Sequence, residues 1–311
     1  MQKPRRPRRP LPLRDGVDPV RIRLADPGQG PRSIPEELRR RFPDRLAELE
    51  AALAAGQVVT ADGEPVTDAT RRRRGMDVWT YRTPAPEVPV PFEIGILHRD
   101  ERLVVVDKPH FLATTPRAGH VTETALVRLR RDLGLDDLAP AHRLDRLTAG
   151  VLVLTVDPAH RGAYQELFAA RRVDKTYLAV APAPVGTPEV RERSSRIHKT
   201  RGILQAAEVH GEPDAHTRIT LLEARGTGAD RLGLYRLEPT TGRTHQIRVH
   251  MNALGTPILG DDLYPRVRAV GPADFSRPLQ LLAEVIGFTD PVSAEKRQFR
   301  TRRTLESWPP G

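Results

Sequence analysis

Short apolar runs of strand length recur along the chain from residue 92 onward. They are LVVV, VLVLTV, TYLAVA, RITLLEA, LGLYRLEP and LQLLAEVIGF, at residues 103–106, 151–156, 176–181, 218–224, 232–239 and 279–288. Runs of this length that are rich in Val, Ile, Leu and Tyr predict β-strands. Between them, TALVRLRRDLG and AYQELFAARR predict helices. A short loop with glycine joins the fourth and fifth runs, so we expect an antiparallel hairpin there.

A different pattern precedes residue 83. Ser33 and Glu36 have the spacing of a helix capping box. Apolar residues then recur at helical spacing from Leu46 to Leu53, ahead of a closing Gly56. The segments QVVTADGEPV and DVWTYR predict a turn at Asp62-Gly63 and short β-strands.

These patterns divide the chain into four segments. Residues 1–30 are rich in Arg, Pro and Gly, which predicts a disordered basic arm. Residues 31–82 are expected to form a small α/β domain, and residues 83–91, with four prolines, predict a linker. For residues 92–311 we expect the α+β class, with a mixed, largely antiparallel sheet flanked by helices.

The charge of the chain indicates a polyanionic partner. Fifty Lys and Arg against 40 Asp and Glu give a net charge of +10. Such a field concentrates polyanions, so nucleic acid is the first partner to expect and an anionic membrane surface the second. The alternative is a solvated, Arg-rich surface that binds nothing specific.

Several kinds of chemistry are disfavoured. The chain has no cysteine, which removes thiolate nucleophiles and Cys-ligated metals and fits a reducing cytosol. No signal-peptide pattern and no run of about 20 apolar residues is present, so we expect a cytoplasmic protein without a membrane segment. His245 and His250 are poorly spaced for a metal, and Asp261 and Asp262 are typical of a turn. We therefore expect no metal site.

Two stretches place polar side chains beside predicted strands. In HRLDRLTAG, Asp145 lies between Arg143 and Arg146, whose positive charges favour the ionised carboxylate. The apolar run that follows predicts that Asp145 lies on a loop anchored by the sheet. In VDKTYLAVA, strand alternation puts Lys175 and Tyr177 on one face. A surface ion pair and a half-buried strand tyrosine are the structural alternatives.

A third stretch is GRTHQIRVHMNALGTPILGDDLYP. Here Thr244 is expected to cap a helix that Gly255 closes, with Arg248 one turn in from its start. An ordinary surface arginine is the alternative for Arg248.

The order and separation of these motifs resemble the RluA-type family of pseudouridine synthases. HRLD with Thr-x-Gly, then K-x-Y-x-A, then GRTHQIRVH and L-G-x-P-I-L-G-D-x-x-Y carry the resemblance. ILHRDERLVVVDKP also resembles the family's first strand and its turn at Lys108 and Pro109. The resemblance spans roughly residues 92–290. Residues 51–82 weakly resemble the ribosomal-protein-type RNA-binding domain that precedes many of these enzymes.

Three positions depart from the family pattern. Ala149 replaces a common Ser, Leu282 stands where a Leu-His-Ala motif has its His, and Asp290 stands where His is common. The last two weaken inferences about RNA contacts, but none of them touches Asp145, Tyr177 or Arg248.

The resemblance implies an isomerase that needs no cofactor. The bond from the sugar to the ring nitrogen of a uridine in RNA is broken, uracil turns, and it is rejoined through carbon 5. By motif position, Asp145 would attack covalently or abstract a sugar proton, and Arg248 would be its partner. Tyr177 would lie against the flipped ring and could assist removal of the proton from carbon 5. The implied substrate-binding residues are Arg143, which would enter the RNA where the base has left, with Leu281, Lys108 and Arg243.

The resemblance also implies RNA as the partner, with large-subunit ribosomal RNA first and transfer RNA second, and a monomer. Two other functions stay open at this point. A pure RNA-binding protein that has lost the chemistry explains the charge equally well, although Asp145, Tyr177 and Arg248 are intact. A glycoside hydrolase is less consistent, because only 5% of residues are aromatic and no second acid is tied to Asp145 by motif.

Overall fold

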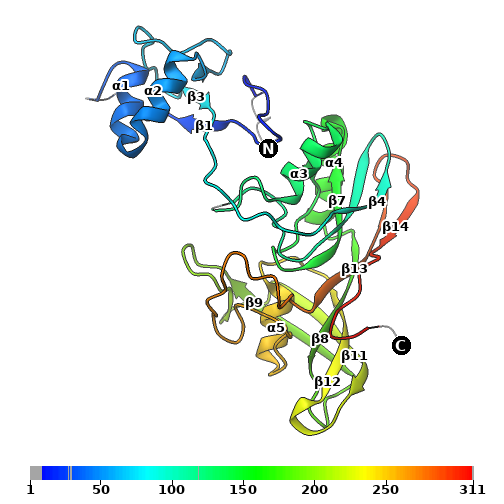
Figure 1. Ribbon diagram of the computed structural model, residues 1–311. Coiled ribbons are helices and arrows are strands. Elements are labelled where there is room, and N and C mark those ends of the chain that lie inside the picture. The colour runs from blue at the N-terminus through cyan, green and yellow to red at the C-terminus, as the bar shows by residue number, and fades with distance from the viewer. Residues whose placement is uncertain (1–8, 27, 29, 118, 310–311) are drawn as a thin grey trace. The chain divides into compact units, whose positions relative to one another are not determined.

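The computed structural model describes residues 9–26, 28, 30–117 and 119–309. The chain forms two compact units that divide after Pro86, within the proline-rich residues 83–91 (Figure 1). None of the helices in the described ranges is long and apolar enough to cross a bilayer.

The first unit packs two helices on a small sheet. Its elements are β1 (Val20–Arg23), α1 (Ile34–Arg41), a 3-10 turn (Pro43–Arg45), α2 (Leu46–Ala54), β2 (Val59–Thr60) and β3 (Asp77–Thr80). The three strands lie in the order β1-β3-β2. Ser33 caps α1, because its Oγ accepts a hydrogen bond from the backbone N–H of Glu36 at 3.4 Å. The predicted helices are confirmed.

Strand β1 lies inside the segment for which we expected a disordered arm. It pairs antiparallel with β3, Val20 opposite Thr80 and Arg23 opposite Asp77. The expectation is wrong for these residues because Ile22 and the following Leu24 are buried in the core of the first unit. Residues 1–8 of the expected arm lie outside the described residues.

The second unit is built on one large sheet. Its strands are β4 (Gly95–Arg99), β5 (Leu103–Lys108), β6 (Ala139–Pro140), β7 (Ala149–Thr155), β8 (Asp174–Pro182), β9 (Val190–His198), β10 (Ala207–Val209), β11 (Ala215–Arg225), β12 (Leu232–Pro239), β13 (Leu281–Thr289) and β14 (Lys296–Arg300). Its helices are α3 (Ala125–Leu133), α4 (Pro158–Ala169) and α5 (Gln246–Ala253), with a 3-10 turn at Gly228–Asp230.

The strand order is β10-β9-β11-β12-β8-β13-β7-β5-β4, with β14 on β13 and β6 on β7. Within the described part of the chain, every pairing in this sheet is antiparallel except that of β13 with β7. The expected mixed, largely antiparallel sheet is therefore confirmed. The six apolar runs are strands β5, β7, β8, β11, β12 and β13, and the two predicted helices are α3 and α4.

Both faces of the sheet centre are covered. Val104 and Val106 of β5 belong to one core, which also contains residues of α3 and α5. Leu103 and Val105 belong to a second core, which contains residues of α4. Because alternate side chains enter two different cores, β5 and β7 read as continuous apolar runs rather than alternating ones.

The junction of β7 and β13 needs a glycine. Gly150 has φ +110°, and a Cβ there would lie 2.2 Å from the carbonyl oxygen of Ala283. Only glycine tolerates both this backbone conformation and so close an approach. The Thr-x-Gly of the first motif, Thr148 to Gly150, thus ends where β7 pairs with β13, and this parallel seam is the one parallel pairing in the described sheet.

Candidate active site

Asp145 lies on the loop between β6 and β7, as predicted. The carbonyl of Asp145 accepts a hydrogen bond from the N–H of Thr148 at 3.2 Å, which closes a turn. The buried Leu144 is held on both sides by Thr114, whose Oγ1 donates to the Leu144 carbonyl at 2.7 Å and accepts from its N–H at 3.1 Å. The Asp145 side chain keeps 27% of its surface exposed. A fixed loop therefore presents an accessible carboxylate.

Lys108 binds the backbone of this loop from the protein interior. Its side chain is fully buried, and Nζ donates to the carbonyls of Pro109, Leu112 and Arg146 at 2.9, 2.7 and 3.3 Å. Burial lowers the pKa of Lys108 to about 7, while the charge of Asp145 acts in the opposite direction. Direct substrate binding, which the resemblance implies for Lys108, does not agree with this burial. Lys108 instead positions the backbone next to Asp145.

Arg248 connects α5 to the loop. Its side chain is 3% exposed, and Nη1 lies 3.9 Å from Oδ2 of Asp145. Nε and Nη2 donate to the two carboxylate oxygens of Asp261 at 2.8 and 2.5 Å. Burial opposes the charge of Arg248, but the hydrogen bonds and charge of Asp261, with Asp145 and Asp262, outweigh it and raise its pKa. The arginine is therefore a permanent cation whose free edge faces Asp145.

Sequence reasoning missed the roles of Asp261 and Asp262, which were read as a plain turn. Asp261 has a side chain 1% exposed and also accepts the backbone N–H groups of Leu263 and Tyr264. Asp262 accepts from Nη2 of Arg248 at 3.0 Å and lies 3.7 Å from Nη2 of Arg146. The available signal was the Gly260-Asp261-Asp262 segment of the third stretch, in which Asp261 follows Arg248 by 13 residues.

The start of α5 differs from the prediction. The helix begins at Gln246, and its N-cap residue is His245, in the left-handed conformation with φ 57°. Thr244 does not cap it. Instead the side-chain oxygen of Gln246 accepts from the N–H of Arg243 at 3.0 Å, because this longer side chain reaches back to the loop. Gly255 follows the helix with φ +73°, as expected.

Tyr177 and Leu281 come together on one face of neighbouring strands. Tyr177 of β8 is opposite Ala283 of β13, and Leu281 is two residues before Ala283, so the alternation places them on the same side. Both belong to the core that α5 helps to form. Burial raises the pKa of the Tyr177 phenol, and the charge of Asp145 adds to the effect. The phenol is therefore neutral at physiological pH.

The two remaining arginines are exposed. Arg143 is exposed, and it has no hydrogen bond or ion pair with any of the residues that the structure describes. Its guanidinium is therefore accessible to solvent. Arg243 pairs with Asp214, Nη2 to Oδ2, at 3.1 Å. Nη2 of Arg146 lies 3.7 Å from Oδ2 of Asp262, and the backbone carbonyl of Arg146 accepts a hydrogen bond from Nζ of Lys108.

The departures from the family pattern have structural roles. Leu282 is buried with Ala149, Val180 and Trp308 on the face away from Tyr177. Asp290 is buried, accepts the hydroxyl of Tyr164 at 2.9 Å and pairs with Nε of Arg297 at 3.0 Å. Neither position points into the Asp145 site.

An accessible carboxylate held against a buried arginine, on a loop of a mixed sheet, is an arrangement suited to nucleophilic or acid–base chemistry. The sequence profile of the RNA pseudouridylate synthase family matches residues 102–253. An uncharacterized RNA pseudouridine synthase of Synechocystis sp. is 33% identical over 211 residues, which cover 66% of this chain and 70% of that protein.

The dual-specificity RNA pseudouridine synthase RluA of Escherichia coli is 33% identical over 215 residues, covering 66% of this chain and 91% of RluA. The solved structure of human RNA pseudouridylate synthase domain containing 1 superposes with a TM-score of 0.55 at 25% identity, covering 68% of this chain and 84% of that one. The chain therefore belongs to the RNA pseudouridylate synthase family, the isomerases that convert uridine to pseudouridine. This membership confirms the expected enzyme class and excludes the glycoside hydrolase alternative.

Proposed function

We propose that this chain isomerises a specific uridine of a structured RNA, with ribosomal RNA as the first candidate and transfer RNA as the second, and that Asp145 is the nucleophile or base. The observation that carries the proposal is Asp145 itself, an accessible carboxylate on a fixed loop with Nη1 of Arg248 at 3.9 Å. The family membership supports the reaction class, and the exposure of Asp145 together with its contact to Arg248 supports its assignment as the reacting group.

The reaction needs only an anion in the right place. The bond from the ribose to N1 of uracil breaks, and a bond from the same ribose carbon to C5 forms. The proton on C5 leaves and N1 gains one, so no oxidant, reductant or group donor is consumed. Asp145 either attacks the ribose carbon or takes a sugar proton that it later returns. Arg248 fixes the direction of the carboxylate in both cases, because its planar guanidinium is itself held by Asp261.

The target uridine is extruded from the RNA before this step. Unstacking costs a few kcal/mol. Stacking of the flipped base on Tyr177 returns about 1–3 kcal/mol, with Leu281 as a further wall. Because the pKa of Tyr177 is raised, we assign it this packing role rather than that of a phenolate base. Arg143 then fills the space that the base has left, and Arg243 contacts phosphate.

The test uses purified protein and unmodified transcripts of large-subunit ribosomal RNA and of transfer RNAs, with pseudouridine mapped site by site. Asp145→Asn should lower turnover by at least about 1000-fold, since the amide can neither attack nor accept the proton, while RNA binding stays within a few-fold of wild type. Asp132→Asn, at an exposed position of α3, is the matched control and should keep full activity. An Asp145→Asn enzyme with wild-type turnover would overturn the assignment.

Mapping in cells separates the proposal from a binding role alone. If one uridine loses its modification when the gene is removed, and only the wild-type gene restores it, both reaction and substrate are identified. If purified wild-type protein binds these transcripts but modifies none of them, the RNA-binding alternative replaces the proposal.

A further inference from the structure

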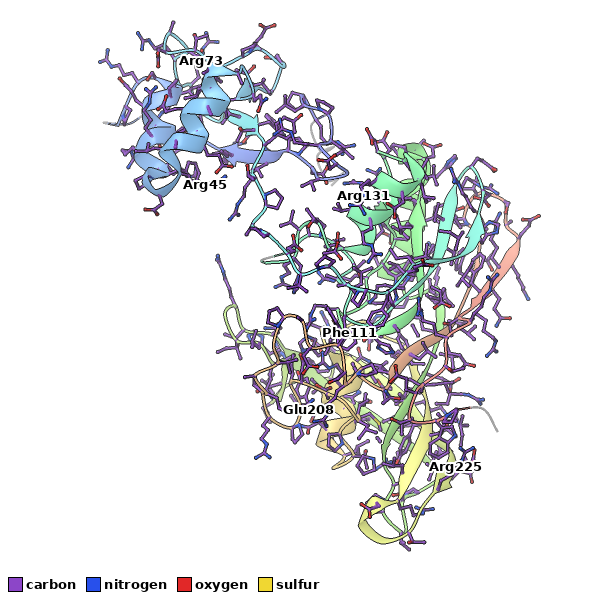
Figure 2. The ribbon with its side chains drawn as sticks, viewed as in Figure 1. Arg45, Arg73, Phe111, Arg131, Glu208 and Arg225 are labelled. Carbon is purple, nitrogen blue, oxygen red and sulfur yellow. The ribbon has the colours of Figure 1, made fainter. Side chains whose placement is uncertain are left out.

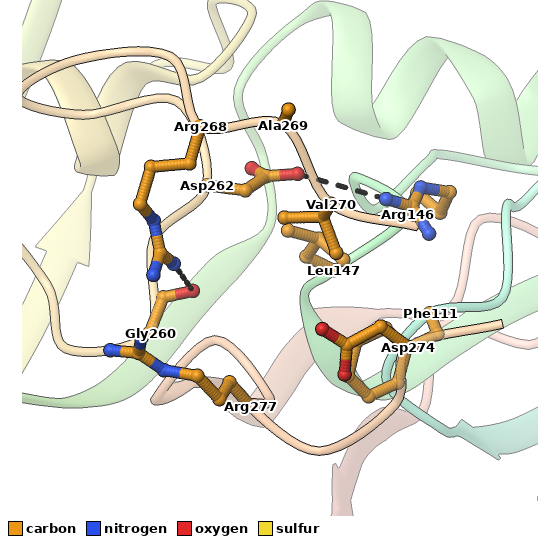
Figure 3. Close-up of a pocket in the computed structure, with 10 residues that line it drawn as sticks. All are labelled: Phe111, Arg146, Leu147, Gly260, Asp262, Arg268, Ala269, Val270, Asp274 and Arg277. Carbon is orange, nitrogen blue, oxygen red and sulfur yellow. Dashed lines mark hydrogen bonds and ion pairs between the residues drawn. The ribbon is translucent and has the colours of Figure 1, made fainter. Parts of the chain in front are cut away.

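A pocket adjoins the loop that carries Asp145, because Arg146 and Leu147 line it. It has a volume of about 190 Å³ and is formed where Arg146 and Leu147 meet the long segment between α5 and β13. Figure 3 shows the guanidinium groups of Arg268 and Arg277 on one side of it and Phe111, Leu147 and Val270 on the other. Neither Asp145 nor Tyr177 lines it, so it is distinct from the place where the target base is expected.

The cationic side of the pocket is only partly neutralised. Arg277 is exposed and has no hydrogen bond or ion pair within the described ranges of the chain. Arg268 donates from Nη2 to the backbone carbonyls of Gly260 and Asp261 at 3.4 and 2.9 Å, which leaves its charge uncompensated by these contacts. A phosphate would therefore meet two guanidinium groups.

The acids in the lining are already engaged. Asp262 is shared by Arg248 and Arg146. Asp274 accepts the N–H and the hydroxyl of Ser276 at 3.0 and 2.6 Å. Besides these hydrogen bonds from Ser276, the charges of Arg277 and Arg268 also help to lower the pKa of Asp274, so this carboxylate neutralises the two arginines in part and leaves a net positive charge.

The opposite side of the pocket has an apolar surface at Phe111, Leu147 and Val270, with Arg146 and Asp274 beside it. Phe111 and Leu147 are buried and fixed, whereas Val270 is 41% exposed at the rim. Pockets for drug-sized ligands start at about 300 Å³, so this one suits a smaller group such as a single base. An apolar wall facing a pair of guanidinium groups is complementary to a nucleotide, whose base is flat and whose phosphate is anionic.

We propose that this pocket binds a nucleotide that neighbours the target uridine in the substrate RNA, with its phosphate at Arg268 and Arg277 and its base against Val270 and Leu147. The proposal rests on the proposed function, because Leu147 and Arg146 directly follow Asp145 in the chain. A neighbouring nucleotide held here would fix the register of the RNA, so that one uridine faces Asp145.

The test measures RNA binding rather than turnover, so that its failure is distinguishable from failure of the proposed chemistry. All proteins carry Asp145→Asn, and binding to an unmodified transfer RNA pool and to a large-subunit ribosomal RNA transcript is followed as a function of salt. Arg277→Gln should reduce the slope of log affinity against log salt by about one. Val270→Glu, which adds a negative charge at the exposed rim, should weaken binding by about tenfold or more.

The control is Arg131→Gln, an exposed arginine of α3 that pairs with Asp132 and lies away from Phe111 (Figure 2). It should leave slope and affinity close to those of the Asp145→Asn parent. Equal slopes for the parent and Arg277→Gln, together with unchanged affinity of Val270→Glu, would overturn the proposal. A parent that binds neither RNA would overturn it as well.

Discussion

At the scale of single residues, the orientation of Arg248 depends on Asp261, a carboxylate whose side chain is 1% exposed. Asp261 takes up Nε and Nη2 of the Arg248 guanidinium, which leaves Nη1 to face Asp145. The sequence predicted the pairing of Asp145 with Arg248 through the family motifs. Asp261 lies within the family motif L-G-x-P-I-L-G-D-x-x-Y, but no pattern indicated that it binds Arg248, because an Asp-Asp pair beside glycine is common in ordinary turns and the arginine it binds is 13 residues away.

Asp261→Asn should therefore impair turnover more than binding. Removing one partner of a buried ion pair costs about 3 kcal/mol of stability. A guanidinium displaced by about 1 Å lowers kcat by roughly 100-fold, while KM for RNA changes little. Asp262→Asn is the matched control, since its carboxylate is more exposed and makes one hydrogen bond to Arg248. If both variants keep the wild-type kcat, the orientation of Arg248 does not depend on Asp261.

A partly buried histidine near the sheet gives the second unit a defined response to acid. Nε2 of His142 accepts the N–H of Val153 at 3.1 Å, and its ring stacks on Phe168. Burial lowers the pKa of His142 from its ordinary 6.5 to about 3, and the charge of Lys175 adds to the shift. Between these two values the unfolded chain binds a proton that the folded chain does not. The free energy of unfolding therefore falls as the pH is lowered through this window.

His142→Gln should make this pH dependence shallower, by up to about 1.4 kcal/mol for each pH unit. Denaturant unfolding between about pH 4.5 and 7 measures it, and the variant is expected to be less stable than wild type at pH 7 because the ring stacking is lost. His210→Gln, at an exposed position, is the control. Parallel stability curves for wild type and His142→Gln would contradict the prediction.

At the scale of elements, burial decides which strands could be predicted. Strands β5 and β7 are buried along their whole length and were recognised as apolar runs. Strand β9, VRERSSRIH, was missed because seven of its nine residues are polar and it buries only Ile197. Strand β14, KRQFR, is an edge strand of the same kind. These polar strands form because β9 pairs with β11 and β14 pairs with β13. Pairing with a strand distant in the sequence leaves no local pattern.

The parallel seam between β7 and β13 is where an element-scale change should be most damaging. Gly150→Ala puts a Cβ 2.2 Å from the Ala283 carbonyl oxygen at a positive φ, so the two strands must separate. We expect a loss of more than about 4 kcal/mol of stability and no measurable turnover. The free energy of unfolding from denaturant titration checks this.

Gly162→Ala is the control in the opposite direction. This glycine lies inside α4, and an added Cβ would meet nothing within 4 Å. It should raise stability by about 0.5–1 kcal/mol. A Gly150→Ala protein as stable as wild type would show that the seam is far less tight than described.

At the scale of the whole molecule, charge and chemistry are divided between the two units. Residues 1–86 hold 18 of the 50 basic and 12 of the 40 acidic residues, and so six of the ten net positive charges. The site residues and the family match all lie in residues 87–311, which have cores of their own. The sequence indicated this division through its proline-rich segment, although it placed the start of the first unit too late.

Deletion of residues 1–86 should therefore weaken RNA binding without abolishing turnover. We expect KM to rise by about tenfold at physiological salt and the salt dependence of binding to become shallower, with kcat at saturating RNA close to wild type. The two tryptophans report the units separately, since Trp79 lies in the first and Trp308 in the second. As the folding control, the unfolding transition of Trp308 in the deletion variant should match the one measured in full-length protein that carries Trp79→Phe. If that transition is intact and kcat is lost, the prediction is contradicted.

The place of β13 in the sheet has a consequence for how the protein is made. This strand is the last but one to leave the ribosome, yet it lies between β7 and β8, which begin more than 100 residues earlier in the chain. Until it emerges, the nascent chain can form only two half-sheets, one bearing Asp145 and the other Tyr177 and Arg248. A truncated product that ends before residue 281 would hold all three groups and still be unable to bring them together, so translation must be nearly complete before the site exists.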